Sequence, residues 1–506
     1  MDISLVRITR VKKRSDFSEK NNQSIDAGKE SMYRNKFLLK IFVCLSAYTH
    51  LMAADSLNQT DALSPVLSGD SLPFKIVIQQ AHFELPVGIH SGASACHEGL
   101  WVFIAGRING LHGFNDPQNF PPDSQNYSVY VVDPKSGITA SRPLNDPTSG
   151  LTQQQIDWLS VTSPQSYQAG QKLYMTGGYG VDSDTGNYST KPILSVINIP
   201  GIIAWVLNPQ GTGQTAAQNI RQLYHPIFQV TGGAMFKSGD LTLLIFGQDF
   251  EGSYTTNSNG NYTEKVRRFY ILDEGKRLSV KPLKPLPKVA DPSYRRRDLN
   301  IVSVIDPTSN CFRTQWIAFG GVFTLAGGVW TVPVEINKKG VSFMKNPQLE
   351  KTFKQAMSQY VCANVGLYSK KHQAMYSTFF GGISLGFFEN GVFETDSEIP
   401  FINQVTTIKW DHKGQFSQYL MEGEYPYIPS SQSTPLLFGA GAYFFNAQVP
   451  AYKNGVIKLD KIHHPILLGY IVGGIQSAKA NTDSSSQSAA SPYVFTVTLI
   501  PQDDHR

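Results

Sequence analysis

Residues 315–323 read QWIAFGGVF, a short apolar run that ends in two glycines. Related stretches recur along the chain, each with apolar and aromatic residues followed by Gly-Gly or a near variant. The others are LWVFIAGR (Leu100–Arg107), KLYMTGGYG (Lys172–Gly180), LTLLIFGQD (Leu241–Asp249), MYSTFFGGI (Met375–Ile383) and LLGYIVGGI (Leu467–Ile475). The second position of each pair falls at 106, 178, 248, 321, 382 and 474, so six repeated units fill most of the chain.

Each unit has a run of small or apolar residues before its glycine strand and an alternating run after it. In the first unit these runs are SGASACHEG (Ser91–Gly99) and YSVYVVDPKSG (Tyr127–Gly137). A poorer fourth run follows in several units, as in SVKPLKPLP (Ser279–Pro287). Four short antiparallel strands repeated around an axis are typical of β-propeller blades. Glycine at the end of the second strand fits a place where a side chain would block the next blade. The repeats therefore predict an all-β propeller of six blades.

The repeats resemble those of the kelch family, whose units read as an apolar strand, Gly-Gly, a loop, and a strand ending in Tyr-x-x-Asp. The resemblance covers roughly residues 74–500 and implies a six-bladed propeller of the galactose oxidase and kelch type. Four units keep the double glycine, whereas Ala105-Gly106 and Gly247-Gln248 depart from it. The tryptophan that follows the third strand in the family is matched at Trp205.

Two runs at the ends of the repeat region lack partners in their own units. FKIVIQQAHF (Phe74–Phe83) precedes the first unit, and YVFTVTLI (Tyr493–Ile500) is the third strand of the last, with no fourth after it. The N-terminal strand can complete the last blade, which would close the ring and remove an open edge. We therefore expect the propeller to span residues 74–502, after a polar linker at 55–73.

Residues 32–54 have the three parts of a secretory signal peptide. Its basic start, apolar middle and small-residue end are Arg34 to Lys40, Ile41–Ala47 and Ala53-Ala54. The apolar part is shorter than the ~20 residues of a spanning helix, so no membrane span is expected in the mature chain; an uncleaved interfacial anchor is the alternative. Residues 1–31 are a polar extension, which fits a true start at Met32. The leader predicts an exported protein, periplasmic or extracellular, and we expect a monomer.

The composition favours β structure over disorder or a helical bundle. Hydrophobic residues make up 41% of the chain and charged residues 16%, below the ~25% of an ordinary soluble domain. The net charge of +5 arises within residues 1–54, which hold 10 Lys and Arg against 5 acidic residues, while the rest of the chain has 34 of each. A neutral body argues against a nucleic-acid partner, which would require a basic excess over the whole domain.

Three cysteines remain after the leader: Cys96, Cys311 and Cys362. No Cys-x-x-Cys or Cys/His cluster occurs, so the sequence carries no zinc signature. Burial as inert small apolar residues is the favoured interpretation. A Cys311–Cys362 disulfide is the alternative in an exported protein.

The longest connections join the second and third strands of the units. Long loops on a rigid scaffold commonly carry binding residues, and in a four-stranded blade these loops share one face with the connections between blades. Two connections between blades are expected to be helical: Thr152–Leu159, with Thr152 and Gln155 forming a capping box, and Leu349–Tyr360. The long loops are Ile108–Asn126, Val181–Lys191, Phe250–Val266, Ser384–Gln404 and Gln476–Pro492.

Arg295-Arg296-Arg297 is the basic cluster of the body and comes just before a strand expected to line the central channel. Guanidinium groups match carboxylates or phosphates with two parallel hydrogen bonds, so the run is a candidate anion site. Arg107, directly after the first glycine strand, would lie on the same face. The alternative is that these are solvated loop arginines paired with Asp291 and Asp298.

Four further residues complete the candidate ligand site. Asp249 could act as a general acid or base, and His225 lies near a strand end. Tyr425 and Tyr427 could stack on a sugar ring, although loop packing is the alternative. No spacing of His, Cys or acidic residues indicates a metal site, so we expect no metal and no cofactor, and no catalytic residue is assigned.

Two functions fit these observations. The first is a binding module for a protein or carbohydrate, acting through the long-loop face. The second is an enzyme, because exported kelch-like propellers include sialic-acid mutarotases, which handle an anionic sugar in the central pocket. Arg107 and Arg295–Arg297 would then hold the carboxylate while a nearby acid or histidine moves the proton. Copper chemistry of the galactose oxidase type requires a Tyr–Cys crosslink and histidine ligands, and no such set can be assigned here.

Overall fold

The computed structural model describes residues 63–113, 119–255, 260–309, 311–482 and 485–502. The expected signal peptide at 32–54 and the extension before it lie outside the described residues. All described residues belong to one compact unit. Among the described residues, no helix combines the length and the hydropathy that crossing a membrane requires.

The described fold is all-β, as expected, and is dominated by six sheets that each contain four antiparallel strands in meander order. In every sheet the glycine-ended stretch supplies the second strand, as the repeats predicted. Sheet 1 consists of β3 (Ala93–His97), β4 (Leu100–Ile104), β5 (Ser128–Asp133) and β6 (Ile138–Pro143). Sheet 2 consists of β7 (Gln165–Ala169), β8 (Lys172–Thr176), β11 (Ile193–Asn198) and β12 (Ile220–Tyr224). Sheet 3 consists of β13 (Ala234–Ser238), β14 (Leu241–Ile245), β17 (Val266–Glu274) and β18 (Arg277–Leu286).

Sheet 6 joins the two ends of the described chain. Its last strand is β2 (Phe74–Glu84), which pairs antiparallel with β37 (Tyr493–Pro501) so that Ile76 lies opposite Leu499. Sheet 4 consists of β19 (Asn300–Ile305), β20 (Thr314–Phe319), β23 (Val334–Ile336) and β24 (Ser342–Met344). Sheet 5 consists of β25 (Ala363–Ser369), β26 (Ala374–Ile383), β29 (Phe401–Asp411) and β30 (Phe416–Glu424), flanked by β1 (Val66–Ser68) and β33 (Ile457–Lys458). Sheet 6 consists of β32 (Tyr443–Asn446), β34 (Ile466–Val472), β37 (Tyr493–Pro501) and β2 (Phe74–Glu84).

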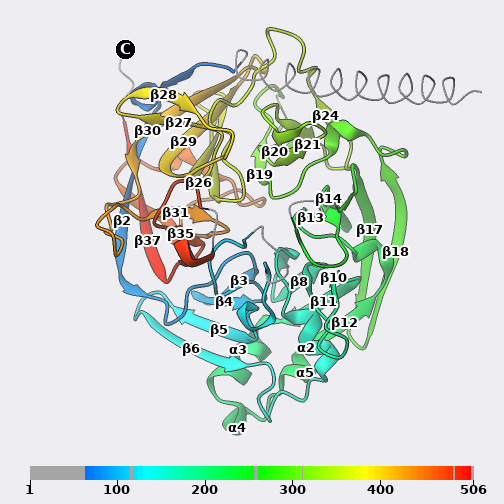
Figure 1. The fold of residues 1–506 in the computed structure, drawn as a ribbon. Coiled ribbons are helices and arrows are strands. Elements are labelled where there is room, and N and C mark those ends of the chain that lie inside the picture. Colours follow the sequence, from blue (N-terminus) through cyan, green and yellow to red (C-terminus); the bar gives the residue numbers. More distant parts are fainter. Residues whose placement is uncertain (1–62, 114–118, 256–259, 310, 483–484, 503–506) are drawn as a thin grey trace, which may run out of the picture. The chain divides into compact units, whose positions relative to one another are not determined.

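The sheets follow one another in chain order around a common centre (Figure 1). Six buried apolar clusters each combine residues of two successive sheets. The cluster between sheets 6 and 1 includes Trp101, whose ring stacks on Phe445 with centroids 4.7 Å apart. Because burying such a ring contributes about 1.5–3 kcal/mol, contact between neighbouring sheets is the main apolar stabilisation of the fold.

A two-residue left-handed turn ends each glycine strand, and its second residue is always glycine. These glycines have φ between 78° and 95°, namely Gly106, Gly178, Gly247, Gly321, Gly382 and Gly474. The pair of the third unit is therefore Phe246-Gly247, one residue earlier than the expected Gly247-Gln248. A Cβ on Gly247 would lie 2.7 Å from the carbonyl oxygen of Thr231, whereas Phe246 tolerates its φ of 55°.

The N–H groups of Gly106, Gly178, Gly247 and Gly474 connect neighbouring sheets. Gly106 donates to the carbonyl oxygen of Val161 at 2.7 Å, and Gly178 donates to that of Val230 at 2.9 Å. Gly474 of sheet 6 donates in the same way to Ile89, just ahead of sheet 1, at 2.9 Å. The glycine turn thus sets the spacing of the sheets as well as ending a strand.

The connections between second and third strands carry small ribbons, which accounts for their length. These are β9 (Tyr179–Val181) with β10 (Tyr188–Thr190), β15 (Gln248–Asp249) with β16 (Asn261–Tyr262), β21 (Val322–Thr324) with β22 (Gly327–Val329), β27 (Gly386–Glu389) with β28 (Val392–Thr395), and β35 (Ile475–Ser477) with β31 (Leu437–Ala440) and β36 (Ser488–Ala490). Short 3-10 turns are η1 (Gly69–Ser71), η2 (Pro122–Ser124), η3 (Pro226–Phe228), η4 (Pro292–Tyr294), η5 (Leu459–Lys461) and η6 (Ser485–Gln487).

One of the two expected helices is present. Helix α2 (Gln153–Leu159) begins with the predicted capping box of Thr152 and Gln155. The prediction of a helix at Leu349–Tyr360 is wrong. The N–H groups of Ala356 and Met357 donate to the side chain of Gln418 instead of to backbone carbonyl oxygens one helical turn earlier. Three further helices follow β11, which sequence periodicity did not indicate: α3 (Ile199–Leu207), α4 (Pro209–Thr212) and α5 (Ala216–Asn219).

Trp205 belongs to α3 and is fully buried, with its indole N–H donating to Thr148. Part of the expected linker is folded, since β1 pairs in parallel with β30.

Cys96, Cys311 and Cys362 are all free, so the disulfide considered for Cys311 and Cys362 does not form. The expected burial is found for Cys362 only, because Cys96 and Cys311 are exposed.

Asp273 connects sheets 2 and 3 through two basic partners. It receives two hydrogen bonds from Arg221, at 2.5 and 2.9 Å, and one from Lys172 at 2.7 Å. The Arg221 hydrogen bonds, opposed by partial burial and aided by Lys172, hold the pKa of Asp273 well below its usual value.

We expect Asp273→Asn to lower the free energy of unfolding by about 2 kcal/mol at pH 7, because two cations lose their carboxylate. A carboxyl group whose pKa is lower in the folded state than in the unfolded chain stabilises the fold fully above the unfolded pKa of about 3.9. This contribution to the free energy of unfolding is lost as the pH falls below that value toward the folded pKa. The difference from wild type should therefore shrink at pH 3. Denaturant titration at both pH values measures it, with exposed Asp240→Asn as the control. An equal difference at pH 7 and pH 3 would contradict the assignment.

Candidate functional site

Equivalent residues of the six sheets meet at the centre. In each sheet the residue three positions before the first strand forms a β-bridge with the residue after the glycine turn. The pairs are His90 with Arg107, Thr162 with Tyr179, Thr231 with Gln248, Arg297 with Val322, Tyr360 with Ile383, and Ala440 with Ile475. All twelve line one cavity of about 560 Å³. The repeat that builds the sheets therefore also builds the site.

An inner ring of backbone supports this cavity. Its members share a left-handed conformation, with φ from 47° to 69°: Ser91, Ser163, Gly232, Asp298, Val361 and Gly441. Ser163 donates its N–H to Ser91 at 2.7 Å, Gly232 to Ser163 at 3.1 Å, and Asp298 to Gly232 at 2.8 Å. Ser91 donates to Gly441 at 3.2 Å, which links sheets 1 and 6. Because these bonds use backbone atoms, the ring is independent of its side chains.

The long loops complete the wall with aromatic and polar side chains. Phe120 and Tyr254 come from the loops of sheets 1 and 3, and their rings meet edge to face with centroids 5.6 Å apart. Ser397, Glu398 and Asn481 come from the loops of sheets 5 and 6. As expected of the long-loop face, these loops surround the cavity.

Arg107 contributes a buried positive charge to the cavity. Only 2% of the residue is exposed, and its guanidinium lies 4.8 Å from the centre of the Phe120 ring. It donates to the side-chain oxygen of Asn109 at 3.0 Å and to the carbonyl oxygen of Pro121 at 3.4 Å, and it forms no ion pair with any described residue. Burial lowers the pKa of Arg107 to about 10, so the group stays charged at neutral pH.

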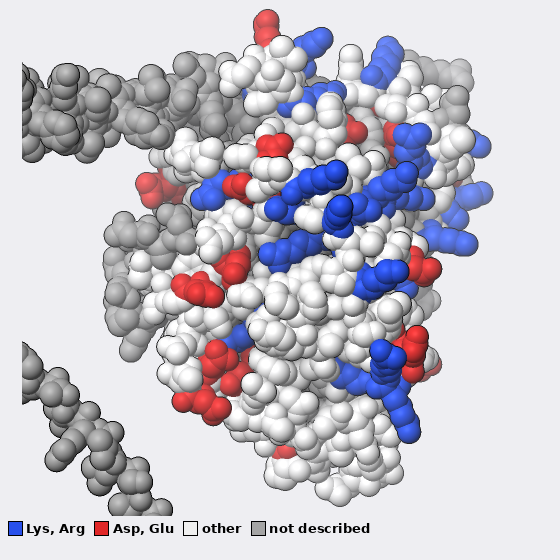
Figure 2. Space-filling model, turned by 90° about the vertical axis from the view of Figure 1, so that its right-hand side faces the viewer, with Lys and Arg blue, Asp and Glu red and all other residues white. Residues whose placement is uncertain are grey.

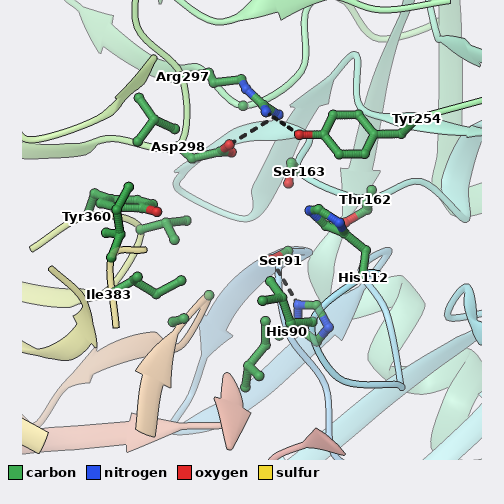
Figure 3. A pocket seen from close by; sticks show the side chains of 18 of the residues that line it. His90, Ser91, His112, Thr162, Ser163, Tyr254, Arg297, Asp298, Tyr360 and Ile383 are labelled. Atoms are coloured by element: carbon green, nitrogen blue, oxygen red, sulfur yellow. Dashed lines mark hydrogen bonds and ion pairs between the residues drawn. The ribbon is translucent and has the colours of Figure 1, made fainter. Parts of the chain in front are cut away.

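Arg297 is held by a more elaborate set of partners (Figure 3). Its guanidinium donates to the hydroxyls of Tyr254 and Tyr262, at 2.8 and 3.2 Å, and lies 3.4 Å from the carboxylate of Asp298. Burial opposes the charge on Arg297, but Asp298 and the two tyrosines outweigh it and raise its pKa. Burial also raises the pKa of Asp298 despite its partner. The charge of Arg297 is therefore balanced by a neighbouring carboxylate, whereas the charge of Arg107 is not.

Two histidines on the cavity wall are neutral. Burial, and then the charge of Arg107, lower the pKa of His90 to about 3, while burial lowers that of His112 to about 4. The Nε2 atom of His90 lies 2.9 Å from the carbonyl oxygen of Asn109 and must donate to it, so Nδ1 accepts from the Ser91 hydroxyl at 3.0 Å. Ser91 is thereby oriented by a neutral imidazole on the cavity wall (Figure 3).

The arginine run diverges once folded. Of its three members only Arg297 lines the cavity. Arg296 is fully buried and donates to the carbonyl oxygens of Gly320 and Val332, with its guanidinium over the Trp330 ring at 4.6 Å. Arg295 lies 3.8 Å over the ring of Tyr262. Successive residues point in different directions, so one anion cannot be held by all three.

The other four expected ligand residues lie outside the cavity wall. Asp249 follows wall residue Gln248 and accepts from Gln229 at 3.1 Å. His225 caps η3, where its Nδ1 accepts from an N–H at 3.0 Å. Tyr425 is buried in the core against Phe438, whereas Tyr427 is 65% exposed and donates to the carbonyl oxygen of Ser433. The structure therefore brings Arg107 and Arg297 together and leaves these four apart.

Sequence reasoning missed most of the wall, including Tyr254, Tyr360 and the role of Asp298. The repeat itself held a signal for part of it, because the residue after each glycine turn lines the cavity. Tyr254 and His112 come from loops with no repeat pattern and gave no such signal. Within the described part of the chain, no group of three His, Cys, Asp or Glu residues is placed to hold a metal ion.

No protein-family model matches the chain, and no curated protein matches it. Among solved structures, that of YjhT is similar with 13% sequence identity and a TM-score of 0.42, over 82% of this chain and 98% of YjhT.

The neutral histidines should make stability depend on pH. Unfolding exposes imidazoles with a pKa of about 6.5, so the unfolded state binds more protons as the pH falls below that value. We expect His90 and His112 each to lower the free energy of unfolding by up to about 2 kcal/mol as the pH falls from 7.5 to 5. Denaturant titrations of wild type and His112→Gln across this range test it, and the variant should show the shallower fall. Parallel curves for the two proteins would rule out a neutral His112.

Proposed function

We propose that residues 74–502 form a six-bladed kelch-like propeller closed by β2. Three observations support this: six sheets of four strands each, the completion of sheet 6 by the N-terminal strand, and apolar clusters between successive sheets. Export through the leader at 32–54 is part of the same proposal and is supported by the sequence pattern alone.

The function that the site supports best is binding of a small acidic carbohydrate in the central cavity. The observation that carries this proposal is Arg107, a buried cation with only neutral partners. Buried charges in proteins are normally paired, so Arg107 is placed to complete its pairing with an anionic ligand. A carboxylate can accept two parallel hydrogen bonds from a guanidinium.

The remaining wall suits the rest of a sugar acid. Aromatic side chains such as Phe250 and Tyr179 provide faces for the apolar side of a pyranose ring, and Ser91 and Ser163 provide hydroxyls for its polar edge. A volume of about 560 Å³ is within the range of small-molecule sites. A cavity of about 560 Å³ is too small for a folded protein domain, so a protein partner would have to contact the surrounding loops.

Catalysis on the same ligand is the second candidate, and the Arg297–Asp298 pair favours it. Opening a sugar hemiacetal requires one group to take the proton of the anomeric hydroxyl and another to protonate the ring oxygen. Burial raises the pKa of Asp298, so this carboxyl holds a proton at higher pH than an ordinary aspartate does. The imidazole of His112, neutral because burial lowers its pKa, lines the same cavity. Accelerated equilibration of the two anomers, followed by NMR, would separate an enzyme from a binding protein.

Substitution of Arg107 tests the carbohydrate proposal. We expect wild type to bind N-acetylneuraminic or galacturonic acid and to discriminate against galactose, and Arg107→Met to weaken acid binding by about 10- to 100-fold, the value of a charge-assisted pair. Calorimetric titration measures both, with exposed Arg313→Gln as the matched control. Equal affinity for acidic and neutral sugars, or an unchanged affinity in Arg107→Met, would refute the anion site.

A further inference from the structure

The neutral body of the protein has a strongly uneven charge distribution. Residues 265–345 contain 15 Lys and Arg against 6 Asp and Glu, although residues 55–506 as a whole have 34 of each. Figure 2 shows Lys and Arg side chains gathered over one face of the molecule, with acidic side chains mostly around them. The face turned to the viewer is the one formed by β17, β18 and β24 at the right of Figure 1.

Most of this excess lies in one strip on the outer edge of sheets 3 and 4. The strip is made of Arg268, Lys276, Arg277, Lys281, Lys284, Lys288, Lys338 and Lys339. Within it, Arg268 donates to the carbonyl oxygen of Lys284 at 3.4 Å. The turn after β23 packs on β17, since a Cβ on Gly340 would lie 3.3 Å from the Arg268 side chain. Lys338 and Lys339 therefore adjoin the basic residues of sheet 3.

The strip exceeds what protection of a sheet edge requires. Lysines and prolines on edge strands prevent unwanted strand pairing, and Pro282 and Pro285 already remove two donors from β18. The outermost strands of the other sheets hold at most one Lys or Arg each, and β30 holds none. No residue of the strip forms an ion pair with a described residue, unlike Arg221 and Lys172 on neighbouring strands.

We propose that this basic strip binds an acidic polysaccharide, a linear chain that carries carboxylate or sulfate groups. β18 alone has ten residues, which at ~3.3 Å per residue makes the strip about 30 Å long. A long, narrow row of flexible cations matches regularly spaced anions on an extended polymer better than it matches a flat membrane. Tyr270 is the one aromatic residue paired with a lysine of β18, namely Lys281, whereas single-stranded nucleic acids use a series of aromatic stacking platforms.

The test compares two quadruple variants that lose the same charge. The first, Lys281→Gln, Lys284→Gln, Lys338→Gln and Lys339→Gln, removes half of the strip. The second is the control and changes four exposed lysines elsewhere: Lys135→Gln, Lys370→Gln, Lys413→Gln and Lys453→Gln. With polygalacturonate and dextran sulfate as probes and neutral dextran as the blank, we expect wild-type binding that weakens with added salt. The strip variant should lose at least about tenfold in affinity, while the control stays within about twofold.

Three results would overturn the proposal. Equal losses in the two variants would mean attraction to net charge alone. Binding to anionic phosphatidylglycerol vesicles without binding to either polymer would assign the strip to a membrane surface. Displacement of the polymer by saturating N-acetylneuraminic acid would place the polymer in the central cavity. Because the strip lies outside the cavity wall, the strip variant should also bind small sugar acids as wild type does, so the two proposals fail separately.

Discussion

No side chain fits at the second residue of the turn that ends each glycine strand. A Cβ at Gly106 would lie 2.4 Å from the carbonyl oxygen of His90, and one at Gly474 would lie 2.8 Å from the Cβ of Ala442. The turn held in this conformation donates a glycine N–H to the neighbouring sheet, as Gly106 does to Val161, and turns the next residue, such as Arg107, toward the centre. The spacing of the sheets and the lining of the cavity thus depend on one steric constraint.

The same constraint explains how much of the fold the sequence predicted. Glycine at the spacing of the repeats marks the second strand of each sheet, and the unpartnered run at 74–83 correctly indicated the pairing of β2 with β37. The sequence failed where tertiary contacts replace local ones. Residues 349–360 have helical spacing, but the N–H groups of Ala356 and Met357 bond to Gln418. Phe246 occupies a left-handed position that sequence alone assigns to glycine.

The candidate site was predictable only where it follows the repeat. Arg107 was found because it comes directly after a glycine turn. The run at 295–297 drew attention through its charge, but charge does not say which way a side chain points, and only Arg297 lines the cavity. Asp249 lies one residue from the cavity wall, His225 caps η3, and Tyr425 is buried in the core. Loop residues such as Tyr254 gave no signal, because their positions are fixed by contacts that no periodicity records.

The inner ring has a further consequence for how a ligand is oriented. Its backbone repeats around the centre almost unchanged, so by itself it offers a guest several equivalent poses. The side chains make these poses inequivalent, because sheet 1 contributes a histidine and an arginine, sheet 4 an arginine, and sheet 6 small or aliphatic residues. Since the ring is held by backbone atoms, these wall residues can be exchanged with little effect on the frame. Selectivity can therefore diverge quickly in such a protein while its architecture stays constant.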